Sequence, residues 1–328
     1  MPQFDMPLEA LGGYRPERSE PSDFDDFWAE TIAGARSIPM SPVFTEVDAG
    51  YTELVTEDVT FPGFHGDPIR GWLLRPRHSS GPLPTVVTYI GYGGGRGLLG
   101  EWTGLPSAGF AHFVMDLRGQ GAGHRTGETP DGDRTGQHLG GFMTMGIEHP
   151  ADYYYRRLFT DAVRAVEAAQ AHPSVDAERV IVSGGSQGGA ISLASAALCG
   201  RHLPTPPRGA IIDVPFLSHI RRATEMVDTA PYSELVRYLR TRRTDPDDVF
   251  ATLDYFDGVN FAARSTIPAT YSVGLLDDVC PPSTVYASYN HYAGPKDITV
   301  YPYNGHEQGG PFREVEHIGF ARSILAVD

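Results

Sequence analysis

Cysteine is scarce in this chain of 328 residues, which contains only Cys199 and Cys280, and no spacing in it is typical of a zinc site. No run approaches the roughly 18 apolar residues of a membrane span. The segment Met1 to Glu20 lacks the basic and apolar regions of a secretory signal. We therefore expect a soluble, cytoplasmic protein with no membrane partner and no metal.

Basic residues are also fewer than acidic ones. The chain has 26 Lys and Arg against 41 Asp and Glu, a formal net charge of −15. Such a surface repels phosphate backbones, so we expect no nucleic-acid partner. It also disfavours anionic membranes and strongly anionic substrates. Hydrophobic residues at 41% and charged residues at 20% are typical of a globular chain rather than a disordered one.

Short apolar runs alternate with helical segments along most of the chain, which predicts a mostly parallel sheet covered on both faces. Alternating residues at 43–75 indicate strands that precede this pattern. The later runs lie at 84–90, 110–115, 179–183, 209–214, 267–273 and 297–301. Helices are expected at 22–36, 151–170, 184–198, 282–292 and 311–325.

Two segments stand outside this alternation. Residues 1–40 read as an N-terminal extension, and about 215–266 read as a helical insertion between two strands. The insertion could act as a lid, a substrate wall or an interface. With these additions, residues 1–328 are predicted to form one α/β domain with a doubly wound sheet.

The sequence Gly184-Gly185-Ser186-Gln187-Gly188 matches G-x-S-x-G between a predicted strand and a predicted helix. That context is the one a nucleophile elbow of the α/β-hydrolase fold requires. Glycines beside the serine relieve crowding in a sharp, strained turn. Ser186 is therefore the predicted nucleophile, although a glycine-rich helix start with a capping serine would look similar.

A serine nucleophile needs a base and a third group that orients the base. In this fold the chain order is serine, then an acid, then histidine. His306 follows the last predicted strand, and Asp277 and Asp278 follow the one before it. The pattern alone leaves the choice between the two aspartates open.

Acyl transfer also needs two donors for the developing oxyanion. The N–H of Gln187 is one candidate, because this residue follows the nucleophile. The glycine-rich loop after 84–90 should supply the other, and Tyr92 lies at a suitable place in it. The loop could instead be a tight turn only, and it lacks the full phosphate-binding and dinucleotide patterns.

Taken together, these motifs resemble carbohydrate esterase family 7, the acetyl xylan esterases and cephalosporin C deacetylases. The resemblance covers nearly the whole chain and rests on these segments: Gly91-Tyr92, Gly94-Gly95-Arg96-Gly97, Arg118-Gly119-Gln120-Gly121, Tyr154-Tyr155-Arg156-Arg157, Ser186-Gln187-Gly188-Gly189, Asp213-Val214-Pro215-Phe216-Leu217, Asp277 to Ser283, and His306-Glu307.

The resemblance implies several properties of the site. It selects Asp277 over Asp278 and assigns the oxyanion donors to the N–H groups of Tyr92 and Gln187. It implies hydrolysis of acetyl esters of xylo-oligosaccharides and of cephalosporin C without any cofactor. It further implies a homo-oligomer, commonly a hexamer whose active sites face an internal cavity.

The chain departs from the family pattern at Ile90 and Gly93, where the family usually has histidine and asparagine. These departures remove polar groups near the acyl pocket, which we expect to be closed by Pro215 and Phe216. A pocket closed by such rigid groups would favour acetate over longer acyl groups.

Two further residues of the motifs, Arg118 and Glu307, are expected to support the site from outside the triad. Arg118 would hold the oxyanion loop by bidentate hydrogen bonds.

Two alternatives remain. The first is a serine hydrolase of the same fold that cleaves another ester or a peptide. The second is a non-catalytic binding protein, which would typically have lost the serine or the histidine. Labelling by a fluorophosphonate probe separates the second from any active hydrolase.

Overall fold

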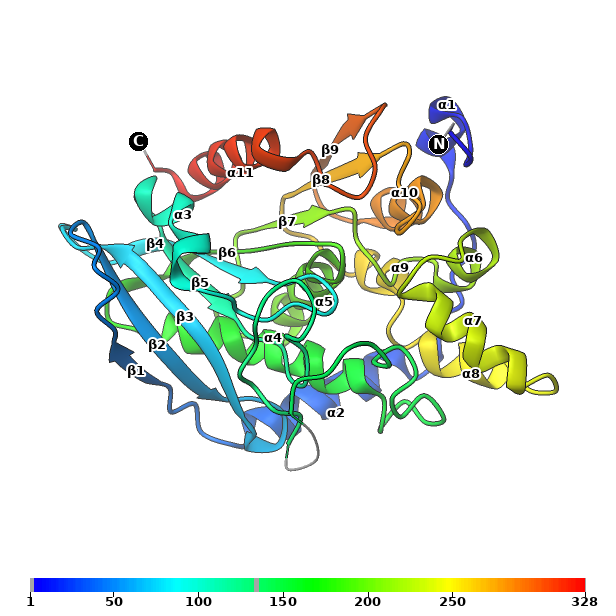
Figure 1. The fold of residues 1–328 in the computed structure, drawn as a ribbon, viewed down its shortest axis with the longest axis horizontal. Helices are drawn as coiled ribbons and strands as arrows, with labels where there is room; N and C mark the ends of the chain where they lie inside the picture. The colour runs from blue at the N-terminus through cyan, green and yellow to red at the C-terminus, as the bar shows by residue number, and fades with distance from the viewer. Residues whose placement is uncertain (1–2, 133–135, 328) are drawn as a thin grey trace.

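A computed structural model describes residues 3–132 and 136–327 and shows an α/β fold with helices on both faces of one sheet (Figure 1). Within these residues the sheet has nine strands in the order β1-β2-β3-β5-β4-β6-β7-β8-β9. Their bounds are β1 Val43–Glu46, β2 Leu54–Pro62, β3 Pro68–Pro76, β4 Leu83–Tyr89, β5 Ala111–Met115, β6 Val175–Gly185, β7 Gly209–Asp213, β8 Ala269–Gly274 and β9 Lys296–Tyr301.

The sheet has an antiparallel edge and a parallel remainder. The pairs β1–β2, β2–β3 and β3–β5 are antiparallel. From β5 through β4 to β9, each neighbouring pair is parallel. The carboxyl ends of the parallel strands therefore meet at one edge, where sheets of this kind place their functional residues.

One face of the sheet is covered by α4 and α5, and α10 packs against β8. The opposite face carries α3 and α11, which lie together at the top left of Figure 1. The helices are α1 Leu8–Gly13, α2 Phe24–Arg36, η1 Phe64–Gly66, η2 Leu99–Trp102, α3 Gly104–Ser107, α4 Tyr154–Gln170, α5 Gln187–His202, α6 Ile220–Met226, α7 Tyr232–Thr241, α8 Pro246–Leu253, α9 Gly258–Ala262, α10 Pro282–His291 and α11 Gly310–Leu325.

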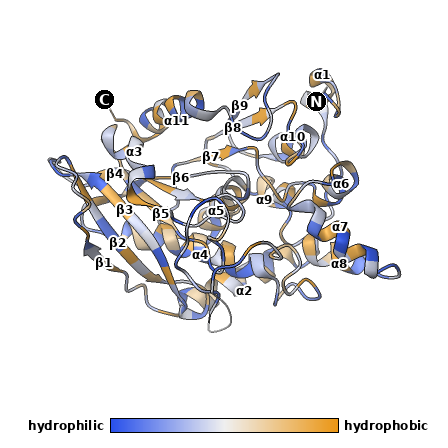
Figure 2. Cartoon of the chain, viewed as in Figure 1, coloured by the Kyte–Doolittle hydropathy of each residue, from blue (hydrophilic) through white to orange (hydrophobic). Residues whose placement is uncertain are grey.

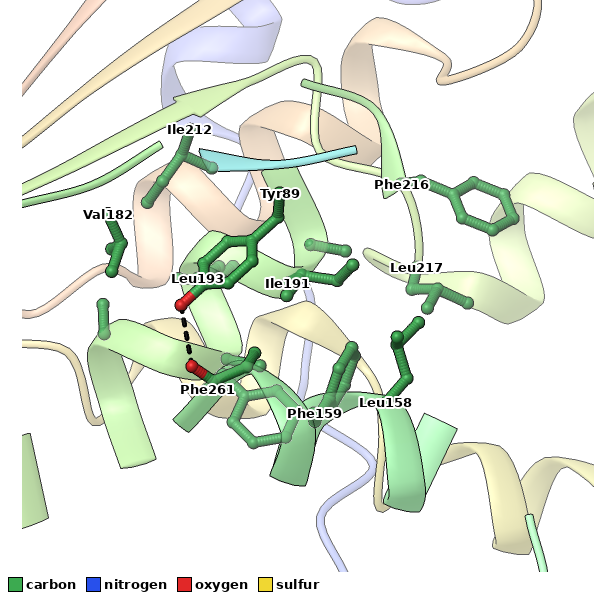
Figure 3. Packing of buried hydrophobic residues seen from close by; sticks show 14 of the residues in the cluster. Tyr89, Leu158, Phe159, Val182, Ile191, Leu193, Ile212, Phe216, Leu217 and Phe261 are labelled. Carbon is green, nitrogen blue, oxygen red and sulfur yellow. Dashed lines mark hydrogen bonds between the residues drawn. The ribbon is translucent and has the colours of Figure 1, made fainter. Parts of the chain in front are cut away.

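The main core lies between the sheet and the α4–α5 layer. Apolar residues colour the central strands and the inward helix faces in Figure 2. Tyr89 of β4 packs there among apolar side chains of β6, α4 and α5 (Figure 3). Its hydroxyl donates to the Ala162 carbonyl at 2.9 Å, so this buried polar group is satisfied.

The predicted strands and helices are present, with ends that shift by a few residues. Residues 43–76 form the antiparallel edge, and the six apolar runs form β4 to β9. The 1–40 segment contributes α1, which packs on α10, and α2, which packs on α4. The segment at about 215–266 holds α6, α7, α8 and α9 between β7 and β8.

In the part of the chain that the structure describes, no helix combines the length and apolar character that crossing a membrane requires.

Candidate active site

Ser186 stands at the turn between β6 and α5 with φ 59° and ψ −122°, a conformation that residues with a side chain rarely adopt. Its N–H donates to the Asp213 carbonyl of β7 at 2.9 Å. A side chain at Gly184 would collide with the backbone of Gly188, and one at Gly188 would collide with the carbonyl of Tyr89. The two glycines therefore permit the sharp turn that places Ser186, which is only 7% exposed, at the wall of the cavity.

A continuous chain of polar contacts runs from Ser186 through His306 to Asp277. Ser186 Oγ lies 2.9 Å from His306 Nε2, and His306 Nδ1 lies 2.9 Å from Asp277 Oδ2. The Asp277 side chain is fully buried, and its Oδ1 accepts the N–H groups of Val279 and Cys280. Three residues from three strand ends thus meet as a serine, a base and an acid in the order the mechanism needs.

The neighbours of this chain separate the two aspartates and explain Glu307. Asp278 is partly exposed, and its carbonyl accepts the Thr229 hydroxyl. Glu307 accepts the side-chain amide of Asn304 at 2.5 Å and the N–H of Gly305 at 2.8 Å. The hydrogen bond from Asn304 lowers the pKa of Glu307. Glu307 therefore closes the turn that carries His306 and does not contact the serine.

The two segments that carry the predicted oxyanion donors are connected by a buried glutamine. Gln187 is the next residue after Ser186, at the start of α5, and Tyr92 lines the same cavity as Ser186. Gln120 accepts the N–H of Gly93 at 2.7 Å and donates to the Gln187 side chain at 3.0 Å. It is fully buried, so one side chain ties the loop of Tyr92 to the first turn of α5.

Hydrogen bonds from the helical insertion also hold Tyr92 in place. The Tyr92 hydroxyl donates to Glu234 of α7, with both carboxylate oxygens at 2.8 Å. The N–H of Phe142 donates to the same hydroxyl at 3.1 Å. Burial raises the pKa of Tyr92, so the hydroxyl stays protonated as the donor. Ala230 and Pro231, just before α7, also line the cavity, so this part of the insertion forms a wall of the site.

Sequence reasoning did not single out Gln120 or Glu234 for these roles. Gln120 belongs to the R-G-Q segment, which was a signal available in the motif. Glu234 lies 142 residues from its partner, and no local pattern marks it.

Arg118 contacts different residues from those expected. Its bidentate hydrogen bonds go to Asp161 of α4, from Nε at 2.6 Å and Nη2 at 2.9 Å, rather than to the loop of Tyr92. Its Nη1 also donates to Asp67 and Asp131. The guanidinium is fully buried, and a buried cation needs carboxylate partners. Arg118 therefore fastens α4 to neighbouring loops, and Gln120 contacts the oxyanion loop instead.

Phe216 lies next to the nucleophile and the oxyanion loop: its N–H donates to the Ser186 carbonyl at 3.0 Å, and its ring lies 6.3 Å from that of Tyr92. Pro215 and Phe216 are both buried, and neither is among the residues that line the cavity beside Ser186. The chain turns inward after β7 through Val214, at φ 36°, and Leu217, at φ 53°. This turn directs Phe216 into the core, where its ring lies 4.5 Å from that of Tyr232 and next to Leu217 (Figure 3).

The cavity at Ser186 has a volume of about 660 Å³ and continues over the sheet face toward α3 and α11. Ile90 lines it beside the loop of Tyr92. Three histidines besides His306 also line it, namely His112, His124 and His317. Burial lowers the pKa of His124 and lowers that of His112 to about 4. Among the described residues, no three His, Cys, Asp or Glu side chains form a group that could hold a metal ion.

Both cysteines are free and buried, and Cys280 lies three residues beyond Asp277. Burial raises the pKa of both thiols, that of Cys199 to about 12. They are therefore held in the protonated form, which is a poor nucleophile.

Comparison with known proteins gives a consistent result along the chain. The family described as acetyl xylan esterase (AXE1) matches residues 1–324. An acetyl xylan esterase from Paenibacillus sp. R4 superposes with a TM-score of 0.87 at 38% identity, over 98% of this chain and 100% of that one. Acetyl xylan esterase 1 from Thermoanaerobacterium sp. JW/SL YS485 gives 0.87 at 33% identity, over 98% and 99%.

A third relative is longer than this chain. Acetyl esterase Axe7A of Xylanibacter ruminicola is 28% identical over 303 residues, which is 89% of this chain. The match spans 65% of the length of that relative.

Proposed function

Because this chain belongs to the acetyl xylan esterase family, we propose that it is a serine esterase that deacetylates small acetylated molecules, such as xylo-oligosaccharides and cephalosporin C-like esters. One observation carries the proposal: the contacts of 2.9 Å that link Ser186, His306 and Asp277 in series. This geometry supports hydrolysis through an acyl-enzyme. The relatives' names support acetyl esters as the substrate class.

In the first half of the reaction, Ser186 Oγ attacks the acyl carbon while its proton passes to His306 Nε2. Asp277 holds the other ring nitrogen and stabilises the imidazolium. The N–H groups of Tyr92 and Gln187 receive the negative oxygen of the tetrahedral intermediate. His306 then gives its proton to the leaving alcohol oxygen. Water repeats these steps on the acyl-enzyme, and acetate leaves.

Kinetics with a panel of esters tests the function. We expect activity on p-nitrophenyl acetate, acetylated xylose and cephalosporin C, with kcat/KM falling from acetate to octanoate. Ser186→Ala should abolish turnover. A maximum at hexanoate or longer would reject the deacetylase and leave the serine esterase standing. Activity on peptides alone would favour the peptidase alternative, and failure to react with a fluorophosphonate would favour a binding protein.

The acid of the triad is tested by a matched pair of variants. Asp277→Asn should lower kcat by roughly 10⁴, because the imidazole would be held in the wrong tautomer. Asp278→Asn should retain activity within a few-fold. A larger loss in Asp278→Asn, with both proteins folded, would reverse the assignment.

We also propose a closed homo-oligomer, a hexamer, in which each chain of residues 1–328 is one domain. Phe312 and Val315 share a face of α11, and they expose 81% and 71% of their areas. An interface would bury this apolar area. Light scattering at micromolar protein decides the matter, since a particle of one 35.7 kDa subunit would reject the assembly.

A cytoplasmic location is the last part of the proposal. The two free thiols suit a compartment that keeps cysteine reduced. Fractionation of the producing cells, followed with an antibody, tests it, and recovery of the protein outside the cytoplasm would reject it.

A further inference from the structure

Gln308 occupies an unusual backbone position two residues after His306. Three consecutive residues adopt left-handed angles, Gln308 at φ 62°, Gly309 at φ 87° and Gly310 at φ 54°. Glycine adopts this region without strain, whereas a residue with a side chain is disfavoured there. Two of the three positions are glycine, and the third carries a long polar side chain. A side chain kept at a strained position calls for a function.

The amide of Gln308 lies directly over Gly185, the residue before the nucleophile, where it takes the space that a side chain on Gly185 would need. Gln308 lines the same cavity as Ser186 and His306. Its loop is fixed at both ends. His306 contacts Asp277, and Arg313 in the first turn of α11 donates to Asp213 at the end of β7 at 2.8 Å.

The direction of the reaction places Gln308 beside the alcohol portion of the ester. The carbonyl oxygen must face the N–H groups of Tyr92 and Gln187. His306 must reach both Ser186 Oγ and the leaving oxygen, so the alcohol departs on the histidine side. Gln308 belongs to that same loop and borders the cavity there.

We propose that Gln308 is a specificity-determining residue whose side-chain amide binds hydroxyl groups of the leaving alcohol. This inference rests on the proposed esterase function and names the alcohol class that it favours. A primary amide offers two donors and an acceptor, which matches the combined donor and acceptor character of neighbouring hydroxyls. An alcohol without hydroxyls gains nothing from the amide, so Gln308 raises the preference for polyhydroxylated alcohols such as sugars and glycerol.

The test compares two acetates of the same carbon length, glycerol monoacetate and propyl acetate, which differ by two hydroxyl groups. In Gln308→Gly we expect kcat/KM for glycerol monoacetate to fall about five- to tenfold, the value of one lost hydrogen bond. The value for propyl acetate should stay within twofold. Because glycine suits the left-handed position, the melting temperature should be no lower than that of the wild type.

Two further variants serve as controls. Gln308→Asn also tolerates left-handed angles but has a shorter amide, so it should show an intermediate ratio. His65→Gly relaxes another left-handed residue, at φ 54° on the surface in η1, and should leave the ratio unchanged.

Equal losses on both acetates, or no loss on glycerol monoacetate, would overturn the role of Gln308. The wild type serves as a separate reference: inactivity on acetylated xylose with activity on propyl acetate would reject the sugar substrate of the proposed function, and the ratio of the two acetates would still decide the role of Gln308.

Discussion

The two sides of the nucleophile are built in opposite ways. On the oxyanion side, Gln120 and Gln187 are fully buried and joined by hydrogen bonds to each other and to tyrosines of α4. On the other side, His306 is 27% exposed, and its turn is held mainly by Glu307, a surface residue. The oxyanion donors must already be in place when charge develops, which favours a rigid and dry environment. The base gains and loses a charge in each cycle, and partial exposure to water lowers the cost of that change.

The largest expected effect separates activity from stability on the histidine side. His306→Ala should lower kcat for p-nitrophenyl acetate by roughly 10⁴ to 10⁶, as Ser186→Ala should, because the triad acts as a unit. Its free energy of unfolding should change less than its activity, since the ring is partly exposed and the buried Asp277 keeps the N–H groups of Val279 and Cys280 as donors. Steady-state kinetics and urea denaturation of both variants check this. A loss of less than a hundredfold would show that another base serves Ser186.

On the oxyanion side we expect activity and stability to fall together. Gln120→Ala removes the link between the Tyr92 loop and Gln187, so kcat should fall by roughly 10² to 10³. The free energy of unfolding should fall by about 2–3 kcal/mol, because buried polar partners are left unpaired. The same two measurements apply. Full activity in a destabilised Gln120→Ala protein would show that the network supports the fold alone.

Acidic pH should also lower the free energy of unfolding, through the buried histidine His112. His112 is buried against the Trp102 carbonyl and the Thr88 hydroxyl, and burial lowers its pKa from 6.5 to about 4. As pH falls below 6.5, the unfolded chain therefore binds a proton before the folded protein does. Stability from the neutral ring is complete above about pH 6.5 and is lost progressively toward pH 4.

His112→Gln provides the matched comparison, because it removes the titration and keeps a polar side chain. Between pH 7.5 and 4.5 the wild type should lose roughly 2–3 kcal/mol more than this variant. Urea denaturation at each pH measures the difference. If the free energy of unfolding fell equally with pH in both proteins, the pKa of His112 would be the same in the folded and the unfolded state.

The smallest expected effect concerns the hydrogen bond between Tyr92 and Glu234 of the helical insertion. Glu234→Ala should lower kcat about tenfold with little change in KM, because the Tyr92 N–H would lose its fixed position. Glu234→Gln keeps an acceptor for the Tyr92 hydroxyl and should recover most of the activity. Glu148→Ala is the matched control, since Glu148 also accepts a tyrosine hydroxyl from α7, that of Tyr238, but on the surface. Equal losses in Glu234→Ala and Glu148→Ala would contradict a role at the oxyanion.

Much of the fold and the serine–histidine–acid order could be predicted because both depend on local patterns. Apolar runs mark buried strands, glycines mark the elbow, and Ser186, Asp277 and His306 each follow a strand end. The long-range side-chain contacts that hold the site in place could not be predicted in this way. The partner of Glu234 is 142 residues away, and the pairing of Arg118 with Asp161 depends on where α4 lies.

The sequence also could not predict the direction in which a side chain points. Phe216 follows β7 closely enough to suggest a place in the pocket, but the sequence does not show that its ring is buried against Tyr92 and Tyr232, in a turn with positive φ angles at Val214 and Leu217. A sequence pattern gives the position of a residue along the chain and does not fix such a turn. The same applies to Gln308, whose left-handed angle between His306 and two glycines becomes visible only in the structure.

The burial of Cys199 and Cys280 has a practical consequence for spectroscopy. Thiol reagents attack the exposed thiolate, and both native thiols are buried and held protonated. A cysteine introduced at Tyr303, which is 87% exposed in the loop before His306, would then react with a maleimide dye while the native pair stays unmodified. The otherwise unaltered chain could thus carry a single fluorophore next to its catalytic loop, where emission would report on substrate arrival in real time.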